Sequence, residues 1–365
     1  GFKAYLIMLN EGKTTGEYKR ADDILNAITE TQNRYGSEVM LSDNKIDAEI
    51  LYNKYDIFKS LFSWYLYIST ILFIALIIQI FYRNKVINSI VGLSKYITYF
   101  LFGIHALGLI ARWYISGHAP WSDGYESMIY VAWATMLFGI YFGKKSDLTL
   151  ASTTFVTSMI LMIAHWSWMD PAIANLVPVL DSYWLMIHVA VIVGSYGPFT
   201  ISMILGIVSL ILMLLVNKRN KEILGINIKE LVLINEMSMT IGLVMLTIGN
   251  FLGGMWANES WGRYWGWDPK ETWALISIMV YAFVLHMRLI PGLKSNFAFT
   301  VASILSFGSI IMTYFGVNFY LAGLHSYAKD DQEISVVFIG ISLTLIMILS
   351  LLAYPKYRNY LKNNR

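Results

Sequence analysis

The chain has 365 residues, of which 56% are hydrophobic and 14% charged, and its mean hydropathy is +0.54. Soluble domains carry about 25% charged residues, so this composition excludes an ordinary soluble protein. The 15% of aromatic residues exclude a disordered one. A net charge of +3 gives no reason to expect a nucleic-acid partner, and the absence of cysteine excludes disulfides and thiolate chemistry. These values predict an all-α, polytopic integral membrane protein.

Residues 1–60 differ from the rest of the chain in their charge. They hold 18 of the 51 charged residues, and Ile24, Leu25 and Ile28 follow a helical period. The segment has neither an initiator methionine nor the layout of a signal peptide. We predict that it is an extracytoplasmic segment and the tail of a longer upstream region.

The remaining chain contains apolar stretches long enough to cross about 30 Å of hydrocarbon. We predict nine transmembrane spans, at 61–82, 93–115, 125–143, 148–168, 183–216, 231–255, 271–290, 297–320 and 334–354. The fifth span is long and contains Gly197–Pro198, so we expect a kink or an extension beyond the bilayer. The first span belongs to a linking segment at 61–92, and residues 93–365 form the membrane domain.

Lysine and arginine fix the predicted orientation. The loops on one side, together with the C-terminal tail, hold fifteen of these residues. The opposite loops hold Arg263, Lys270 and Lys329, with Arg112 close by. Because basic loops stay in the cytoplasm, we predict a cytoplasmic C-terminus and an external N-terminal segment. The predicted location is the bacterial cytoplasmic membrane.

A predicted external loop at 255–273 concentrates aromatic residues. Five of the twelve tryptophans of the chain lie between Trp256 and Trp273. An interfacial aromatic belt is the alternative interpretation, but a belt distributes its rings over many helix ends. Here Gly262 and Gly266 separate the rings and allow the backbone to approach a flat partner closely. The pattern therefore favours a binding surface.

Two predicted helix starts carry capping residues. Asp268 is expected to cap the seventh span, with Pro269 at its first position and Glu271 near its dipole. The segment 120–127 precedes the third span and includes Glu126. Ser122 or Asp123 is a helix cap in one interpretation, and in the other Glu126 holds the tryptophan-rich loop or a histidine. The spacing leaves both interpretations open.

Tryptophan and tyrosine around an arginine suit a large, planar, partly anionic ligand. Aromatic faces would cover the ring, and Arg263 or backbone N–H groups would bind its carboxylates. Heme has this chemistry, and in a chain without cysteine its natural axial ligand is imidazole. His188 and His325 lie on the same predicted side as the loop, so we predict that they bind the heme iron from its two faces.

The other four histidines have less defined roles. His286 lies about 22 Å from the outer end of the seventh span, at about 1.5 Å per residue. It is either a second heme ligand or a neutral, hydrogen-bonded membrane residue. His105 has the same two interpretations with weaker support. We interpret His118 and His165 as interfacial residues.

The segment Trp-Gly-Arg-Tyr-Trp-Gly-Trp-Asp-Pro-Lys-Glu-Thr-Trp at 261–273 resembles the "WWD" motif of the heme-handling family of cytochrome c biogenesis. Trp-Ser-Asp-Gly-Tyr-Glu-Ser at 121–127, Gly-Leu-His-Ser-Tyr at 323–327, and His286 followed by Arg288 resemble the CcsA (ResC) branch of System II.

The resemblance covers roughly residues 61–354. Residues 1–60, with Ala-Glu-Ile-Leu-Tyr-Asn-Lys at 48–54, are similar to the join of fused CcsB–CcsA proteins. The resemblance implies a cytochrome c synthetase that exports heme and attaches it to the CxxCH motif of apocytochrome c outside the membrane. It also implies a CcsB-like portion or subunit and proteins of a thiol-reducing pathway as partners.

The same resemblance implies the residues that bind heme b, which is held transiently and without covalent bonds. His188 and His325 would be the external axial ligands, and His286 would be a transmembrane ligand. No nucleophile of this chain takes part, because the substrate supplies its own thiols. The predicted heme-contacting residues besides the histidines are Trp256, Trp261, Arg263, Tyr264, Trp265, Trp267 and Asp268.

Two functions of other classes remain open at this point. The chain is alternatively a heme transporter or chaperone that does not form thioethers, which an assay with apocytochrome would separate. A b-type electron-transfer subunit would keep its heme and would carry paired histidines deep in facing helices. The best histidine pair of this sequence is external.

Overall fold

The computed structural model describes residues 1–37, 40–82, 84–165, 169–173, 182–321, 323 and 336–362. Within these residues all regular structure is helical, which confirms the predicted fold class. The chain divides into two compact units, Gly1–Lys54 and Tyr55–Arg365. The first unit is built from α1 (Phe2–Thr15), α2 (Lys19–Gly36) and most of α3 (Asp43–Tyr55), and α1 packs against α2.

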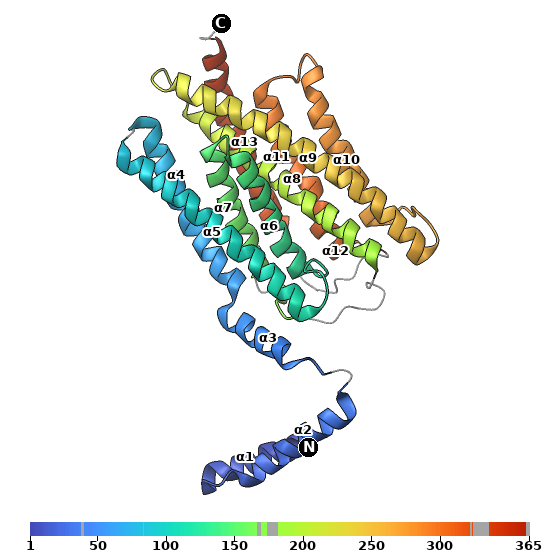
Figure 1. Ribbon diagram of the computed structural model, residues 1–365. Helices are drawn as coiled ribbons and strands as arrows, with labels where there is room; N and C mark the ends of the chain where they lie inside the picture. Colours follow the sequence, from blue (N-terminus) through green and yellow to red (C-terminus); the bar gives the residue numbers. More distant parts are fainter. Residues whose placement is uncertain are drawn as a thin grey trace. The chain divides into compact units, whose positions relative to one another are not determined.

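The second unit is a helical bundle whose long helices run alongside one another (Figure 1). Its helices are α4 (Ile57–Phe81), α5 (Lys85–Ser116), α6 (Gly124–Gly143), α7 (Asp147–Ala164), α8 (Tyr183–Leu215), α9 (Lys221–Trp261), α10 (Pro269–His286), α11 (Asn296–Ile311), α12 (Val317–Tyr320) and α13 (Val336–Lys362). A 3₁₀ turn at Met287–Leu289 follows α10, and a π-helical turn at Met312–Gly316 joins α11 to α12.

Helix α8 is the centre of the bundle. It packs against α6, α7, α9, α11 and α13, and most of its residues are buried. Pro198 lies inside α8, which is one helix of 33 residues. At about 1.5 Å per residue it is about 50 Å long, so the predicted extension beyond a bilayer of about 30 Å fits its length.

Eight helices of the described residues are long and apolar enough to cross a membrane. This supports a multi-pass membrane protein. The nine predicted spans all coincide with helices, but α6, at the predicted span 125–143, is not among the eight. Because α6 is largely buried between other helices, it tolerates Glu126 and Tyr125 where a lipid-facing helix would be apolar.

Helix α9 continues beyond both ends of the sixth predicted span. Helix α9 begins at Lys221 and ends at Trp261, whereas the sequence prediction was 231–255. The polar first turns and the tryptophan-containing last turn continue the helix beyond its apolar part. A hydropathy pattern marks the apolar stretch and not the helix end, which Gly262 sets with a left-handed φ of 71°.

Candidate functional site

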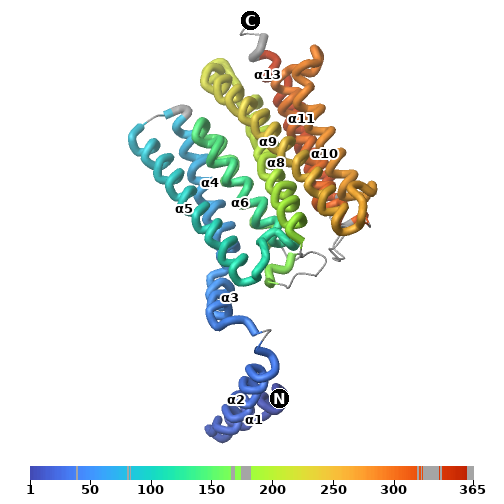
Figure 2. The backbone as a smooth tube through the Cα atoms, turned by 45° about the vertical axis from the view of Figure 1, so that its right-hand side comes forward, coloured from blue at the N-terminus to red at the C-terminus, as the bar shows by residue number. Residues whose placement is uncertain are grey.

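The predicted ligand His188 and the tryptophan-rich segment meet at one end of the bundle. His188 lies in the second turn of α8, and Trp256 lies in the last two turns of α9. Their rings stack with centroids 5.3 Å apart and an interplanar angle of 23°. Figure 2 shows the start of α8 and the α9–α10 junction at the same end of the bundle. The structure therefore brings together two residues that are 68 positions apart in the sequence.

The His188 ring is held in one orientation and one tautomer. Its side chain is buried, and Nδ1 lies 2.8 Å from the carbonyl oxygen of Trp184, one turn earlier in α8. A carbonyl only accepts, so Nδ1 donates, and the neutral ring carries its lone pair on Nε2. Gly253 of α9 lies beside the same ring, and a Cβ built on it would be 3.8 Å from Nε2. This is the arrangement that prepares a histidine to coordinate a metal through Nε2.

Much of the tryptophan-rich segment is helical, whereas the sequence prediction was a loop at 255–273. Residues 255–261 are the end of α9, and α10 begins at Pro269, so only residues 262–268 connect the two helices. Trp256 is fully buried, and its ring contacts the edge of the Trp261 ring at 4.8 Å between centroids. The helix end thereby fixes these two rings as a rigid platform beside His188.

The connection between α9 and α10 is stabilised by contacts among its own residues and with the first turn of α10. The guanidinium of Arg263 lies 3.8 Å from the Glu271 carboxylate and over the Trp261 ring. Glu271 also accepts a hydrogen bond of 2.8 Å from the backbone N–H of Gly266. A Cβ on Gly266 would collide with the Arg263 guanidinium, so a larger residue there would displace the end of that side chain. Arg263 thus shapes the connection, and its contact with a heme carboxylate stays a prediction.

The outer part of the connection presents two aromatic rings to the surroundings. Tyr264 and Trp267 are 62% and 70% exposed, and Trp265 touches Trp267 edge-on at 5.8 Å. Trp267 has a φ of 58°, a left-handed backbone conformation that costs a bulky residue about 1–3 kcal/mol. The predicted contact of Trp267 with heme stays a prediction.

The start of α10 agrees with the sequence prediction. Asp268 and Glu271 form a capping box, and Pro269 is the first residue of the helix, which confirms the three predicted roles. Lys270 donates a hydrogen bond of 3.1 Å to Asn318 of α12. The capped helix end is therefore tied to the segment that follows α11.

That segment leads toward the second predicted ligand. A Cβ on Gly323 would collide with Oδ1 of Asp268 and would lie 2.9 Å from Cδ of Pro269. The chain two positions before His325 therefore packs on the end of the tryptophan-rich segment. His325 itself lies outside the described residues.

The structure does not bring His286 to this site. It is the last residue of α10, at the opposite helix end from Asp268, and its side chain is exposed. Its Nδ1 lies 2.7 Å from the carbonyl oxygen of Ala282, the same bond to the preceding turn that His188 makes. The predicted transmembrane role of His286 stays a prediction.

The other histidines contact protein groups. His105 is fully buried, with Nε2 3.1 Å from the Ile129 carbonyl oxygen and its ring edge-on to Phe58. Nδ1 of His118 lies 3.2 Å from the hydroxyl of Ser122. His165 lies in the turn that follows α7, with Nδ1 2.9 Å from a main-chain carbonyl.

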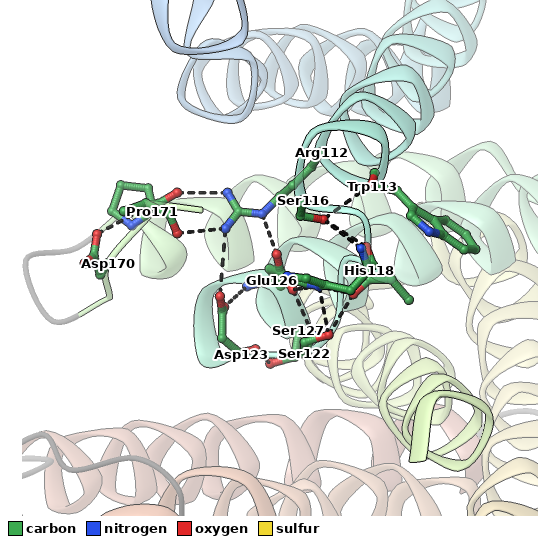
Figure 3. Close-up of polar contacts among 12 residues, drawn as sticks. Arg112, Trp113, Ser116, His118, Ser122, Asp123, Glu126, Ser127, Asp170 and Pro171 are labelled. Carbon is green, nitrogen blue, oxygen red and sulfur yellow. Dashed lines mark hydrogen bonds and ion pairs between the residues drawn. The ribbon is translucent and has the colours of Figure 1, made fainter. Parts of the chain in front are cut away.

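Sequence reasoning missed a buried ion pair near this end of the bundle. Arg112 of α5 and Glu126 of α6 have side chains that are 0% and 1% exposed, and Arg112 Nε donates to Glu126 Oε1 at 2.7 Å (Figure 3). Arg112 was counted only among the loop charges. A basic and an acidic residue in or beside two predicted neighbouring spans was the signal that could have revealed the pair.

Backbone groups and a second carboxylate complete this cluster. Arg112 donates to the carbonyl oxygens of Pro171 and Ala172 at 2.8 and 3.0 Å. The carboxylate of Asp123 lies 3.8 Å from the guanidinium and caps α6 through the N–H of Glu126. Partial burial and the neighbouring Glu126 charge raise the pKa of Asp123 to about 6.

Comparison with known proteins identifies relatives over much of the chain. The family described as cytochrome c assembly protein matches residues 121–325. The protein NrfI of Wolinella succinogenes is 44% identical over 339 residues, which are 93% of this chain and 38% of that protein. This chain therefore spans well under half the length of that relative.

Proteins named cytochrome c biogenesis protein CcsA are similar over most of their own length. The protein of Ranunculus macranthus is 35% identical over 70% of this chain and 93% of its own. The protein of Prochlorococcus marinus subsp. pastoris is 35% identical over 61% of this chain and 79% of its own. The matched family segment runs from Trp121 to His325 and contains the helices that build the site.

Proposed function

The chain belongs to the cytochrome c assembly protein family, and we propose that within cytochrome c biogenesis it holds heme beside His188 and attaches it to apocytochrome c. The observation that carries this proposal is the buried His188 ring, which stacks on Trp256 and has its Nε2 lone pair set by the bond to Trp184. A histidine prepared in this way beside an aromatic platform suits axial coordination of a heme iron.

The proposed heme site uses the residues around the α9–α10 connection. His188 and His325 bind the iron from opposite faces, which excludes oxygen from the iron and tunes its potential. Arg263 or backbone N–H groups bind a carboxylate of the porphyrin. The rings that cover the porphyrin are those of Trp256, Trp261, Tyr264, Trp265 and Trp267, next to Asp268.

The attachment needs no nucleophile from this chain. The CxxCH segment of the apocytochrome binds at the exposed rings, and its histidine displaces one of the two axial ligands. Each substrate thiol then adds across one vinyl group of heme b: sulfur bonds to one vinyl carbon, the thiol hydrogen goes to the other, and nothing is released. The protein contributes orientation and proximity, which are worth about 7–11 kcal/mol of barrier in well-aligned systems.

Heme supply and partners complete the proposal. His286 receives heme at the opposite end of α10, which the positive-inside pattern places toward the cytoplasm of a bacterial cell. The α9–α10 connection and the first sixty residues then face outside. A CcsB-like portion or subunit and thiol-reducing proteins are the proposed partners. Any covalent continuity with a CcsB-like region stays a prediction.

Replacement of His188 by glycine tests the proposal. Purified wild-type protein is expected to show the low-spin spectrum of bis-imidazole heme, and the His188→Gly variant is expected to lose that spectrum and at least nine-tenths of holocytochrome formation. Millimolar imidazole should restore both, because it replaces the missing ligand. His165→Gly is the matched control, since His165 lies outside the proposed site, and it should behave as wild type.

An in vitro assay separates attachment from delivery. Purified protein with bound heme is incubated with an apocytochrome peptide under reducing conditions, and covalent heme is measured after acid extraction. Covalent product that depends on His188 supports a synthetase. Transfer of heme that acid extraction removes from the peptide would identify a chaperone. An unchanged low-spin spectrum in His188→Gly would overturn the site itself.

Trp267→Gly is expected to separate backbone strain from binding. Glycine adopts the left-handed φ of this position without strain, so the thermal unfolding temperature in detergent should stay equal or rise slightly. Heme content should fall about two- to tenfold, because one stacked aromatic ring is worth about 0.5–1.5 kcal/mol beyond its area. Trp267→Phe should keep most of the heme. Equal heme content in all three proteins would contradict a binding role for this ring.

A further inference from the structure

Two side chains, one in α6 and one in the segment before it, donate hydrogen bonds to the face of α8 opposite the proposed ligand. Trp121 Nε1 donates a hydrogen bond of 3.0 Å to the carbonyl oxygen of Met186, and the Tyr130 hydroxyl donates one of 3.3 Å to that of Ala190. These two acceptors lie two residues before and two residues after His188. Because they are four residues apart, they share one face of α8.

His188 lies on the other face. Two residues correspond to about 200° around a helix, which turns the imidazole away from α6 and toward Trp256 of α9. The two donors therefore form hydrogen bonds with this turn of α8 on the face opposite the His188 imidazole. Any rotation or shift of this turn changes the angle at which Nε2 points.

The two donors are themselves fixed. The Trp121 and Tyr130 rings contact each other with centroids 4.9 Å apart, and Tyr130 stacks on Trp133 at 5.9 Å. Ser122, next to Trp121, donates its backbone N–H to Oε2 of the buried Glu126 at 2.9 Å. Glu126 is in turn held by Arg112 (Figure 3). A buried charge pair thus anchors the segment that carries the first donor.

We propose that Trp121 and Tyr130 are positioning residues that set the coordination geometry of His188 by holding the α8 backbone at Met186 and Ala190. This inference rests on the proposed role of His188 and adds to it a support that lies outside the tryptophan-rich segment. Neither residue touches the heme in this arrangement; each acts through the helix that carries the ligand.

The test is the double variant Trp121→Phe, Tyr130→Phe, which keeps an aromatic ring at each position and removes both donors. The heme is reduced, and the rate of carbon monoxide binding is measured, because carbon monoxide binds only when an axial histidine has left the iron. We expect the protein to retain heme and the rate to rise about fivefold for each donor lost, which corresponds to a hydrogen bond of typical strength. Each single variant should show about half of the effect on a logarithmic scale.

The chain offers a matched control for the tyrosine substitution. The Tyr65 hydroxyl is buried and has no hydrogen-bond partner among the described residues. Tyr65→Phe therefore removes the same atom without removing a hydrogen bond, and this variant should bind carbon monoxide at the wild-type rate.

A ligand that is not attached to α8 distinguishes positioning from a general structural effect. In His188→Gly with added imidazole, the ligand is free of the helix, so the double variant should bind carbon monoxide at the same rate as its parent. An accelerated rate in that background, or a wild-type rate in the double variant with His188 present, would overturn the inference. If His188→Gly alone leaves the spectrum unchanged, the proposed function fails instead, and the two failures are distinct.

Discussion

Glu126→Ala is expected to lower the free energy of unfolding by about 3–5 kcal/mol, the cost of leaving a buried charge without its partner. The Arg112 side chain is 0% exposed and donates to Glu126 at 2.7 Å. No solvent is available to replace the carboxylate. The loss also frees the backbone N–H of Ser122, which donates to the same side chain. Thermal unfolding in mild detergent measures the effect.

Two further variants identify the cause of this destabilisation. Arg112→Met in the Glu126→Ala background removes the buried charge that has lost its nearest carboxylate and should recover part of the lost stability, because the penalty comes from the charge and not from the missing bond. Asp123→Asn is the matched control. Its carboxylate lies 3.8 Å from the same guanidinium but is 41% exposed, so its loss should cost about 1 kcal/mol or less. Equal melting temperatures for Glu126→Ala and Asp123→Asn would contradict the assignment.

The sequence predicted the fold class and the helix positions because hydropathy and helix-capping chemistry are local. Asp268, Pro269 and Glu271 show this well: their order in the sequence is sufficient to define a capping box. Helix α9 extends beyond the sixth predicted span for the same reason. Its polar first turns are stabilised by helical hydrogen bonds that no apolar pattern records.

The candidate site was partly accessible to the same reasoning. The clustering of tryptophans and the side of the membrane predicted for His188 placed both in one region, and their rings are in contact. The hydrogen bonds to the α8 backbone were not predictable, because Trp121 donates to a backbone carbonyl 65 positions away. Any residue type at 186 offers that carbonyl, so the sequence carries no sign of the acceptor.

Gly266→Ala is expected to disturb the α9–α10 connection by displacing the Arg263 side chain. The new Cβ would collide with the Arg263 guanidinium, which lies over the Trp261 ring and 3.8 Å from the Glu271 carboxylate. Overpacking of this kind costs about 1–3 kcal/mol. If the connection must keep its shape to bind heme, the affinity of the variant for heme should fall about 5- to 150-fold. Heme titration of the purified apoprotein measures this affinity.

Removal of the Arg263 side chain tests whether the Gly266→Ala effect comes from the collision. In Arg263→Ala, Gly266→Ala the collision is absent, and so are the contacts of Arg263 with Trp261 and Glu271. The double variant should therefore bind heme with the affinity of Arg263→Ala, and a further loss in the double variant would show that the added methyl group does not act through Arg263. Gly262→Ala is a poor control, because Gly262 itself has a left-handed φ. Gly292→Ala is a suitable one, since a Cβ there meets nothing within 4 Å. An affinity of Gly266→Ala equal to that of Gly292→Ala would show that the packing of Arg263 on Gly266 does not shape the heme site.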